Sequence, residues 1–339
     1  MRPFAYRRAE EAAPAAPVSP DAADVPAGLQ AVQYLAGGTN ILDYMKLDVM
    51  RPAELVDING LAGRYGRIEA GPQGLHLGAL ARMAEAQDHP DIRRDYPVIA
   101  QSLQLAASQQ IRNMASLGGN VLQRTRCSYF RDTRNGACNK RAPGSGCAAQ
   151  DGVDRKHAIL GTSDACIATY PGDFAQALVA LDAMVELSSA AGARVIRFEE
   201  LHRPYGDSPH LETTLKPGEL ITGFHVPAGP WTRRSLYLKI RDRQSYEFAL
   251  VSAAVALDLG EGGRVNAARI ALGGVASRPW RAHEAEAALA GNRLDEAGAR
   301  RAAEIAFAAA RPRGQNAFRV ELGKRTLVRA LLAAAAMEA

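Results

Sequence analysis

The chain of 339 residues is long enough for two or three domains, and its 47% apolar and 23% charged residues are typical of a globular protein. Its 41 basic and 36 acidic residues leave a net charge of +5 without the concentrated basic stripe of a nucleic-acid-binding protein. No apolar run approaches the roughly 20 residues that cross a bilayer. The first 28 residues lack the hydrophobic core of a signal peptide, so we expect a cytoplasmic protein or one exported with a signal-bearing partner.

The first 60 residues predict a small α/β unit that contains a glycine turn. Residues 9–28, rich in Ala, Pro and Asp, predict a surface insertion. Residues 33–35 and 55–58 predict strands, with a helix over 41–47 between them. The turn Ala36-Gly-Gly-Thr-Asn40 lies between the first strand and the helix, where backbone N–H groups can approach an anion closely. The pattern fits a pyrophosphate site, and a plain turn fits it equally well.

Residues 61–228 predict a second unit with a turn of the same type. Residues 67–70 and 74–78 predict a hairpin, and residues 81–87 and 97–109 predict helices. The turn Ala115-Ser-Leu-Gly-Gly-Asn-Val121 follows. Two such turns suit a ligand with two phosphates and a flat ring, such as FAD, whereas a mononucleotide would need only one.

All four cysteines, Cys127, Cys138, Cys147 and Cys166, lie in the polar segment 123–169, which is long for a loop without regular structure. Their spacing matches neither the C-x2-C zinc pattern nor a ferredoxin run. They are either unrelated small hydrophobic residues or a four-thiolate site for zinc or a [4Fe–4S] cluster, which would supply the order that the loop lacks. The arginines among them suit a negatively charged cluster, an acidic partner or a solvated surface.

The residues after the cysteine segment predict one more helix, further strands and a separate C-terminal domain. Asp173 is placed to cap a helix over 174–181. Lys239 could place a cation near a flavin ring, although a snorkelling strand lysine is the commoner case. Leu220 and Ile221 could cover an apolar ring face, although core packing explains them equally well. Strands are predicted over 183–187, 194–198, 218–227, 231–239, 249–259 and 265–275, and helices over 283–290, 295–310 and 317–337. Nothing in the sequence resembles a Ser-His-Asp or Cys-His catalytic set.

Taken together, these motifs resemble the FAD-binding medium subunit of the molybdenum hydroxylase family, which includes xanthine dehydrogenases, aldehyde oxidoreductases and carbon monoxide dehydrogenase. The resemblance is carried by residues 35–40 with 42–46, by 110–113 with 115–120, by 171–173, and by 272–276 with Pro279. The sequence of residues 123–169, here called the cysteine loop, is similar to that of the bacterial aldehyde oxidoreductases of the three-subunit type. Their flavin subunit carries an extra [4Fe–4S] cluster.

The resemblance implies an α+β fold: a two-part FAD-binding domain of the vanillyl-alcohol-oxidase (PCMH) type, followed by a C-terminal α+β domain of the CO dehydrogenase flavoprotein type. The implied domains are 1–60, 61–228 with the inserted loop 123–169, and 231–339. The implied cluster ligands are Cys127, Cys138, Cys147 and Cys166. The implied FAD-binding residues are Leu35, Ala36, Gly37, Gly38, Thr39, Asn40, Ile41, Ala115, Ser116, Gly118, Gly119, Asn120, Ala168, Thr169, Asp173, Leu220, Ile221 and Lys239.

The resemblance also implies partners and a reaction. A large subunit with a molybdopterin cofactor would oxidise an aldehyde to its acid, and a small subunit would pass the electrons through two [2Fe–2S] clusters. FAD in this chain would accept them and reduce an external acceptor, so this chain would hold cofactors and carry no catalytic residue of its own. The alternatives are a stand-alone flavin oxidase and a zinc-stabilised assembly scaffold.

Overall fold

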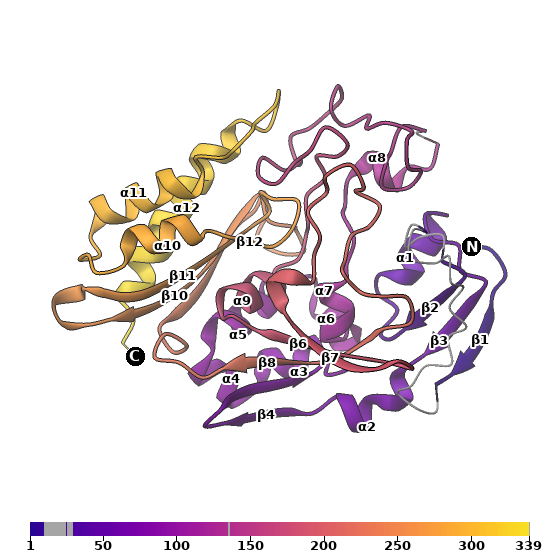
Figure 1. Cartoon of the computed structure of the whole chain (residues 1–339), viewed down its shortest axis with the longest axis horizontal. Helices are drawn as coiled ribbons and strands as arrows, with labels where there is room; N and C mark the ends of the chain where they lie inside the picture. The colour runs from indigo at the N-terminus through magenta and orange to yellow at the C-terminus, as the bar shows by residue number, and fades with distance from the viewer. Residues whose placement is uncertain (10–24, 26–29, 135, 339) are drawn as a thin grey trace.

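The computed structural model describes residues 1–9, 25, 30–134 and 136–338, which form three sheets and the helices around them (Figure 1). The insertion predicted over 9–28 lies almost entirely outside the described residues. None of the helices in the described ranges combines the length and the apolar character needed to cross a membrane.

The first sheet has three parallel strands in the order β1-β3-β2, and it confirms the predicted α/β unit. Parallel neighbours need a crossover, and helix α1 (Ile41–Lys46) provides it between β2 and β3. The first strand was not predicted, because its Ala-Tyr-Arg-Arg sequence carries little hydrophobic signal. The elements are β1 (Ala5–Arg8), β2 (Val32–Leu35), β3 (Glu54–Asp57), η3 (Asn59–Leu61) and α2 (Ala62–Tyr65).

The second sheet has five antiparallel strands in the order β4-β5-β8-β6-β7. Its strands are β4 (Ile68–Gly71), β5 (Gly74–Gly78), β6 (Met184–Ser189), β7 (Gly192–Arg197) and β8 (Leu220–Pro227). The helices of this part are α3 (Met83–Asp88), α4 (Pro90–Asp95), α5 (Pro97–Gln104), α6 (Gln109–Met114), α7 (Leu117–Val121) and α9 (Phe174–Ala180). Leu77, Leu103 and Phe174 lie in the buried apolar cluster shared by strands and helices.

One helix prediction in this part is wrong. The helix expected over 97–109 ends at Gln104, and a new helix begins at Gln109. Ala107 has a φ of +49° between them, and the Ser108 hydroxyl then caps the new helix by accepting from the Ile111 amide at 3.4 Å. This break sets the direction of α6, which leads directly into the second glycine turn.

The third sheet has the order β12-β11-β10-β9, and helices α10, α11 and α12 belong to the same C-terminal part. Its elements are β9 (Ser235–Ile240), β10 (Val251–Leu259), η5 (Glu261–Gly263), β11 (Val265–Gly273), β12 (Trp280–Arg281), α10 (His283–Leu289), α11 (Glu296–Ala306) and α12 (Phe318–Ala335). Tyr237, Ala254 and Ala271 of this part are buried in the apolar cluster of the second sheet. The two parts therefore share a core.

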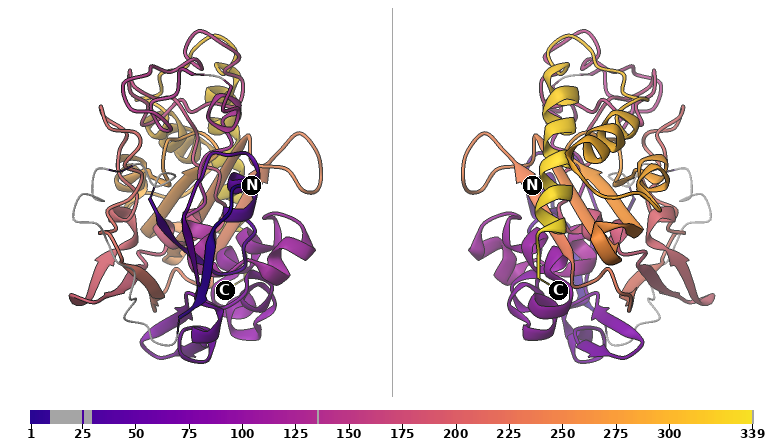
Figure 2. Two further views of the ribbon diagram at one scale, coloured as in Figure 1. Left: turned by 90° about the vertical axis from the view of Figure 1, so that its right-hand side faces the viewer. Right: turned by 90° about the vertical axis from the view of Figure 1, so that its left-hand side faces the viewer.

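The cysteine loop contains one short helix, α8 (Ser128–Arg131), and the loop lies to one side of the three sheets, above α1 in Figure 1. Its early part rests on α1, where Phe130 packs edge-on against Tyr44. Its later part pairs with the C-terminal part through Leu160 and Ala276, and Arg155 lies over the Phe318 ring at the start of α12. Figure 2 shows the loop beside that end of α12.

Candidate functional site

The two glycine turns lie against each other. Gly37 sits on the backbone of Met114, so that a Cβ on Gly37 would lie only 1.9 Å from the Met114 carbonyl oxygen. Asn40 links the turns by donating from Nδ2 to the Gly119 carbonyl at 3.4 Å. Gly38 has a φ of +74°, a conformation that favours glycine. Two motifs nearly 80 residues apart therefore form one surface.

A pair of polar side chains braces this surface, and neither was singled out from the sequence. Asn59 donates to the Ala36 carbonyl at 2.9 Å. Arg82 donates to the Asn59 side-chain oxygen at 2.9 Å and to the Met114 carbonyl at 2.5 Å. Only the three-dimensional contact reveals these residues, because they lie far along the chain from the turns that they hold.

The turns offer groups that remain open for a ligand. Within the part of the chain that the structure describes, the backbone N–H groups of Gly38, Thr39 and Asn40 donate no hydrogen bond. Asn120 donates to the Met83 sulfur, while its Oδ1 is buried without a partner among the described residues. Ser116 caps α7 by accepting from the Gly119 amide at 3.2 Å. Free amides beside a buried, unsatisfied acceptor fit a ligand that carries both phosphates and hydrogen-bond donors.

Asp173 lies in a buried polar group together with Lys239. Asp173 stands at the start of α9, but its carboxylate does not cap the helix as predicted. It accepts instead from the Lys239 ammonium at 2.8 Å and from the Tyr237 hydroxyl at 2.6 Å. Lys239 also donates to the Leu105 carbonyl at 2.9 Å, and the side chains of the ion pair are almost fully buried. Burial and the neighbouring carboxylate raise the pKa of Tyr237 well above its usual value.

The remaining predicted flavin contacts are dispersed over three clusters. Leu220 packs beside Ala36 of the first turn, whereas Ile221 belongs to the main core. Ala168 packs with Cys166, and the Thr169 hydroxyl donates to the Lys156 carbonyl at 3.0 Å. The contact of these four residues with FAD remains a prediction.

The four thiols come close to one another, and all are free. Cys138 and Cys147 pair through their backbones, and the side chains of Cys147 and Cys166 are hydrogen-bonded. Cys127 lies close enough to Cys138 and Cys147 to interact with them electrostatically. The His157 Nε2 lies 3.2 Å from the Cys127 sulfur. Backbone amides also approach the sulfurs; the Ala168 amide, for example, lies 3.4 Å from the Cys166 sulfur.

The microenvironments of these thiols differ. Burial raises the pKa of the Cys127 thiol to about 11. The hydrogen bond between Cys147 and Cys166 lowers the pKa of the Cys147 thiol and raises that of Cys166. Among the described residues, no three His, Cys, Asp or Glu side chains are arranged as ligands of one metal ion. The predicted metal site is therefore not confirmed by geometry alone.

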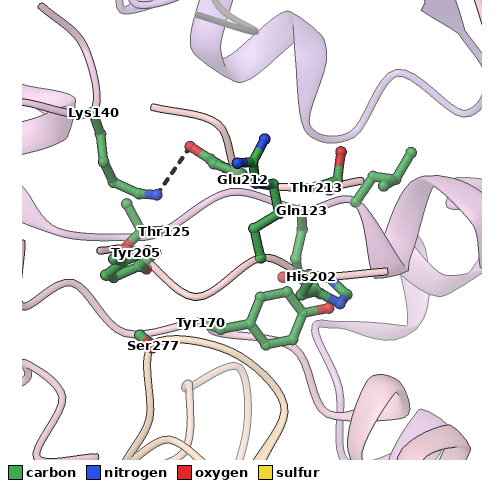
Figure 3. Close-up of a pocket in the computed structure, with 11 residues that line it drawn as sticks. Gln123, Thr125, Lys140, Tyr170, His202, Tyr205, Glu212, Thr213 and Ser277 are labelled. Atoms are coloured by element: carbon green, nitrogen blue, oxygen red, sulfur yellow. Dashed lines mark ion pairs between the residues drawn. The ribbon is translucent and has the colours of Figure 1, made fainter. Parts of the chain in front are cut away.

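A buried cluster of charged side chains links the cysteine loop to Glu212. Glu212 pairs with Arg124 at 2.8 Å and with Lys140 at 3.2 Å, and all three side chains are largely buried. Figure 3 shows the pair of Lys140 and Glu212. Lys140 also lies 4.2 Å from the centre of the Tyr205 ring and donates to the Pro209 carbonyl. Burial raises the pKa of Glu212, but the two cations outweigh it and bring the pKa down to about 2. The small cavity beside this cluster, about 30 Å³, has room for little more than a water molecule.

The comparisons with known proteins agree with this arrangement. Residues 16–229 match the FAD binding domain in molybdopterin dehydrogenase, and residues 236–334 match the CO dehydrogenase flavoprotein C-terminal domain. The chain is 45% identical over 99% of both chains to the aldehyde oxidoreductase FAD-binding subunit PaoB of Escherichia coli. It is 27% identical to the carbon monoxide dehydrogenase medium chain of Afipia carboxidovorans, over 88% of this chain and 86% of the relative.

A solved Cu,Mo-CO dehydrogenase chain superimposes with a TM-score of 0.72 at 26% identity, over 99% of each chain. The predicted fold class, an FAD-binding part followed by a CO dehydrogenase flavoprotein-type domain, is thus confirmed. The chain belongs to the FAD-binding medium subunits of the molybdenum hydroxylase family, which are components of oxidoreductase complexes.

Proposed function

We propose that this chain is the FAD-carrying, electron-output subunit of a molybdenum-dependent aldehyde oxidoreductase. A large molybdopterin subunit would oxidise the aldehyde to its acid, and a small subunit with two [2Fe–2S] clusters would deliver the electrons. The observation that carries the proposal is the 45% identity to an aldehyde oxidoreductase subunit over 99% of both chains, far above the 27% to the CO dehydrogenase chain.

The residues of this chain would hold the cofactor rather than perform chemistry on a substrate. When bound, FAD supplies the electron-accepting ring. The open amides of Gly38, Thr39 and Asn40 would receive its pyrophosphate, and the buried Asn120 oxygen would accept from a donor of the cofactor. Asp173 and Lys239 form an ion pair whose charges cancel. The pair would line the ring region with fixed polar groups that carry no net charge.

We further propose that Cys127, Cys138, Cys147 and Cys166 hold a [4Fe–4S] cluster. Each thiolate of such a cluster binds a different iron, so the sulfurs need not surround one point as they do at zinc, where each lies 2.3 Å from the metal. The mutual proximity of the thiols supports this, as do the amides near their sulfurs. The buried cations Arg124 and Lys140 also lie close enough to interact with Cys138 and Cys166, respectively. Hydrogen bonds to the sulfurs and nearby cations both stabilise a negatively charged cluster.

The test is the iron, zinc and flavin content of the protein purified anaerobically with its co-expressed partners. We expect about four irons in this chain beyond those of the small subunit, together with one FAD and aldehyde-dependent reduction of an artificial dye. The Cys138→Ser variant should lose the additional iron and keep FAD, while Arg134→Gln, at an exposed position of the same loop, should keep both. Absence of flavin would refute the proposed function, and zinc or no extra metal would refute only the cluster.

A further inference from the structure

Arg126 of the cysteine loop has different partners from Arg124, Arg131 and Arg134. Arg124, Arg131 and Arg134 each pair with a carboxylate, those of Glu212, Asp43 and Asp132. Arg126 is half-buried, and among the described residues no carboxylate lies within ion-pair distance of it. A guanidinium that is partly removed from water without a counter-charge is costly, so its position needs an explanation.

The Arg126 guanidinium lies at the first glycine turn. It donates to the side-chain oxygen of Asn40 at 2.8 Å, to the Arg124 carbonyl at 2.6 Å and to the Tyr44 hydroxyl. The rings of Tyr44 and Phe248 lie 5.4 and 5.2 Å from its central carbon. These contacts fix the side chain from three separate segments of the chain, which is more than a solvated surface arginine requires.

Asn40 is the meeting point of this arrangement. Its Nδ2 donates to Gly119 of the second turn, and its Oδ1 accepts from Arg126. The unpaired cation is therefore one side chain away from the open amides of the first turn. The hydrogen bonds to Tyr44, Arg124 and Asn40 use three of the five N–H groups of Arg126, so two donors remain for an anion. Arginine is well suited to bind phosphate because its planar fork can donate two parallel hydrogen bonds.

We propose that Arg126 provides the counter-charge for the FAD pyrophosphate, so that the cysteine loop contributes directly to the flavin site. This inference rests on the proposed function, because it takes FAD as the ligand of the two turns. Arg126 immediately precedes Cys127, a proposed cluster ligand. The cysteine loop and the flavin site would then meet at one residue, Arg126.

The experiment measures the dissociation constant of FAD for the full-length chain after removal of its flavin, by the quenching of flavin fluorescence. The variants are Arg126→Gln, Arg126→Lys and the matched control Arg134→Gln, each compared with wild type at low and high salt. Iron per chain is measured in the same samples. Competition by ADP, which carries the diphosphate, is compared with competition by adenosine, which does not.

We expect Arg126→Gln to weaken FAD binding at least tenfold, with iron retained, and to lose most of the salt dependence. The Lys variant should recover part of the affinity because it keeps the charge, and the Arg134 control should match wild type. ADP should compete less well in Arg126→Gln, while competition by adenosine stays unchanged.

Three results would overturn the inference. Unchanged FAD affinity in Arg126→Gln would show that the arginine does not meet the cofactor. Loss of iron together with FAD would show that it only holds the loop in place, as would an equal weakening of ADP and adenosine. A wild-type chain that binds no FAD would instead refute the proposed function itself, which separates the two failures.

Discussion

Replacement of Glu212 by Gln should destabilise the protein strongly at neutral pH. The carboxylate is the shared counter-charge of Arg124 and Lys140, whose side chains are 7% and 2% exposed. The substitution keeps the shape but leaves two buried cations uncompensated. The fall in the pKa of Glu212 from 4.5 to about 2 corresponds to roughly 3 kcal/mol of stabilisation. That agrees with the roughly 3–5 kcal/mol lost when one partner of a buried ion pair is removed.

The sign of the pH dependence follows from the direction of this shift. Because the folded protein lowers the pKa of Glu212, its contribution is complete above pH 4.5 and is lost as the pH falls towards 2. The difference in unfolding free energy between wild type and Glu212→Gln should therefore be about 3 kcal/mol at pH 7 and about 1 kcal/mol at pH 3.

Urea unfolding of the full-length protein, followed by circular dichroism at several pH values, measures this difference. Glu296→Gln is the matched control, because Glu296 forms an exposed ion pair with Arg300 on α11 and should change stability little. A difference between wild type and Glu212→Gln that stays below 1 kcal/mol at pH 7, or that does not shrink on acidification, would refute the stabilising role of the cluster.

Two further substitutions test the flavin site. Gly37→Ala should separate the two turns and lower FAD occupancy severalfold, since its Cβ would meet the Met114 oxygen; Gly63→Ala, where a Cβ meets nothing within 4 Å, is the control, and equal occupancy in both variants would contradict the argument. Tyr237→Phe removes the hydroxyl bonded to Asp173 and should cost about 1–3 kcal/mol. It should also shift the flavin absorption spectrum, and a spectrum and melting temperature identical to wild type would argue against that network.

The elements of this protein were largely predictable from its sequence. Helix α1, the hairpin of β4 and β5, and the run of strands followed by helices after residue 230 appear where periodicity and turn residues place them. These features depend on residues a few positions apart, and short-range sequence patterns report such interactions well. The prediction of a single helix over 97–109 was wrong because the break at Ala107 lies inside an otherwise helical sequence pattern.

The features of the candidate site also divide into those that the sequence reveals and those that depend on contacts between distant residues. The glycine turns and the group of four cysteines are properties of the sequence, because glycine and thiol chemistry is recognisable residue by residue. The role of Asp173 was missed because its partners Tyr237 and Lys239 lie more than 60 residues away, and a carboxylate at a helix start looks like a cap when viewed locally. Arg126 was likewise only one of several loop arginines in the sequence.

Only the tertiary structure decides which of these groups meet. It places Gly37 on Met114, Arg126 on Asn40, and Glu212 between two buried cations. Such contacts arise when distant segments pack to bury apolar surface, and the polar groups carried along must then find partners with each other. The sequence by itself therefore determined which chemistry is present, and the packing of distant segments determined where that chemistry is assembled.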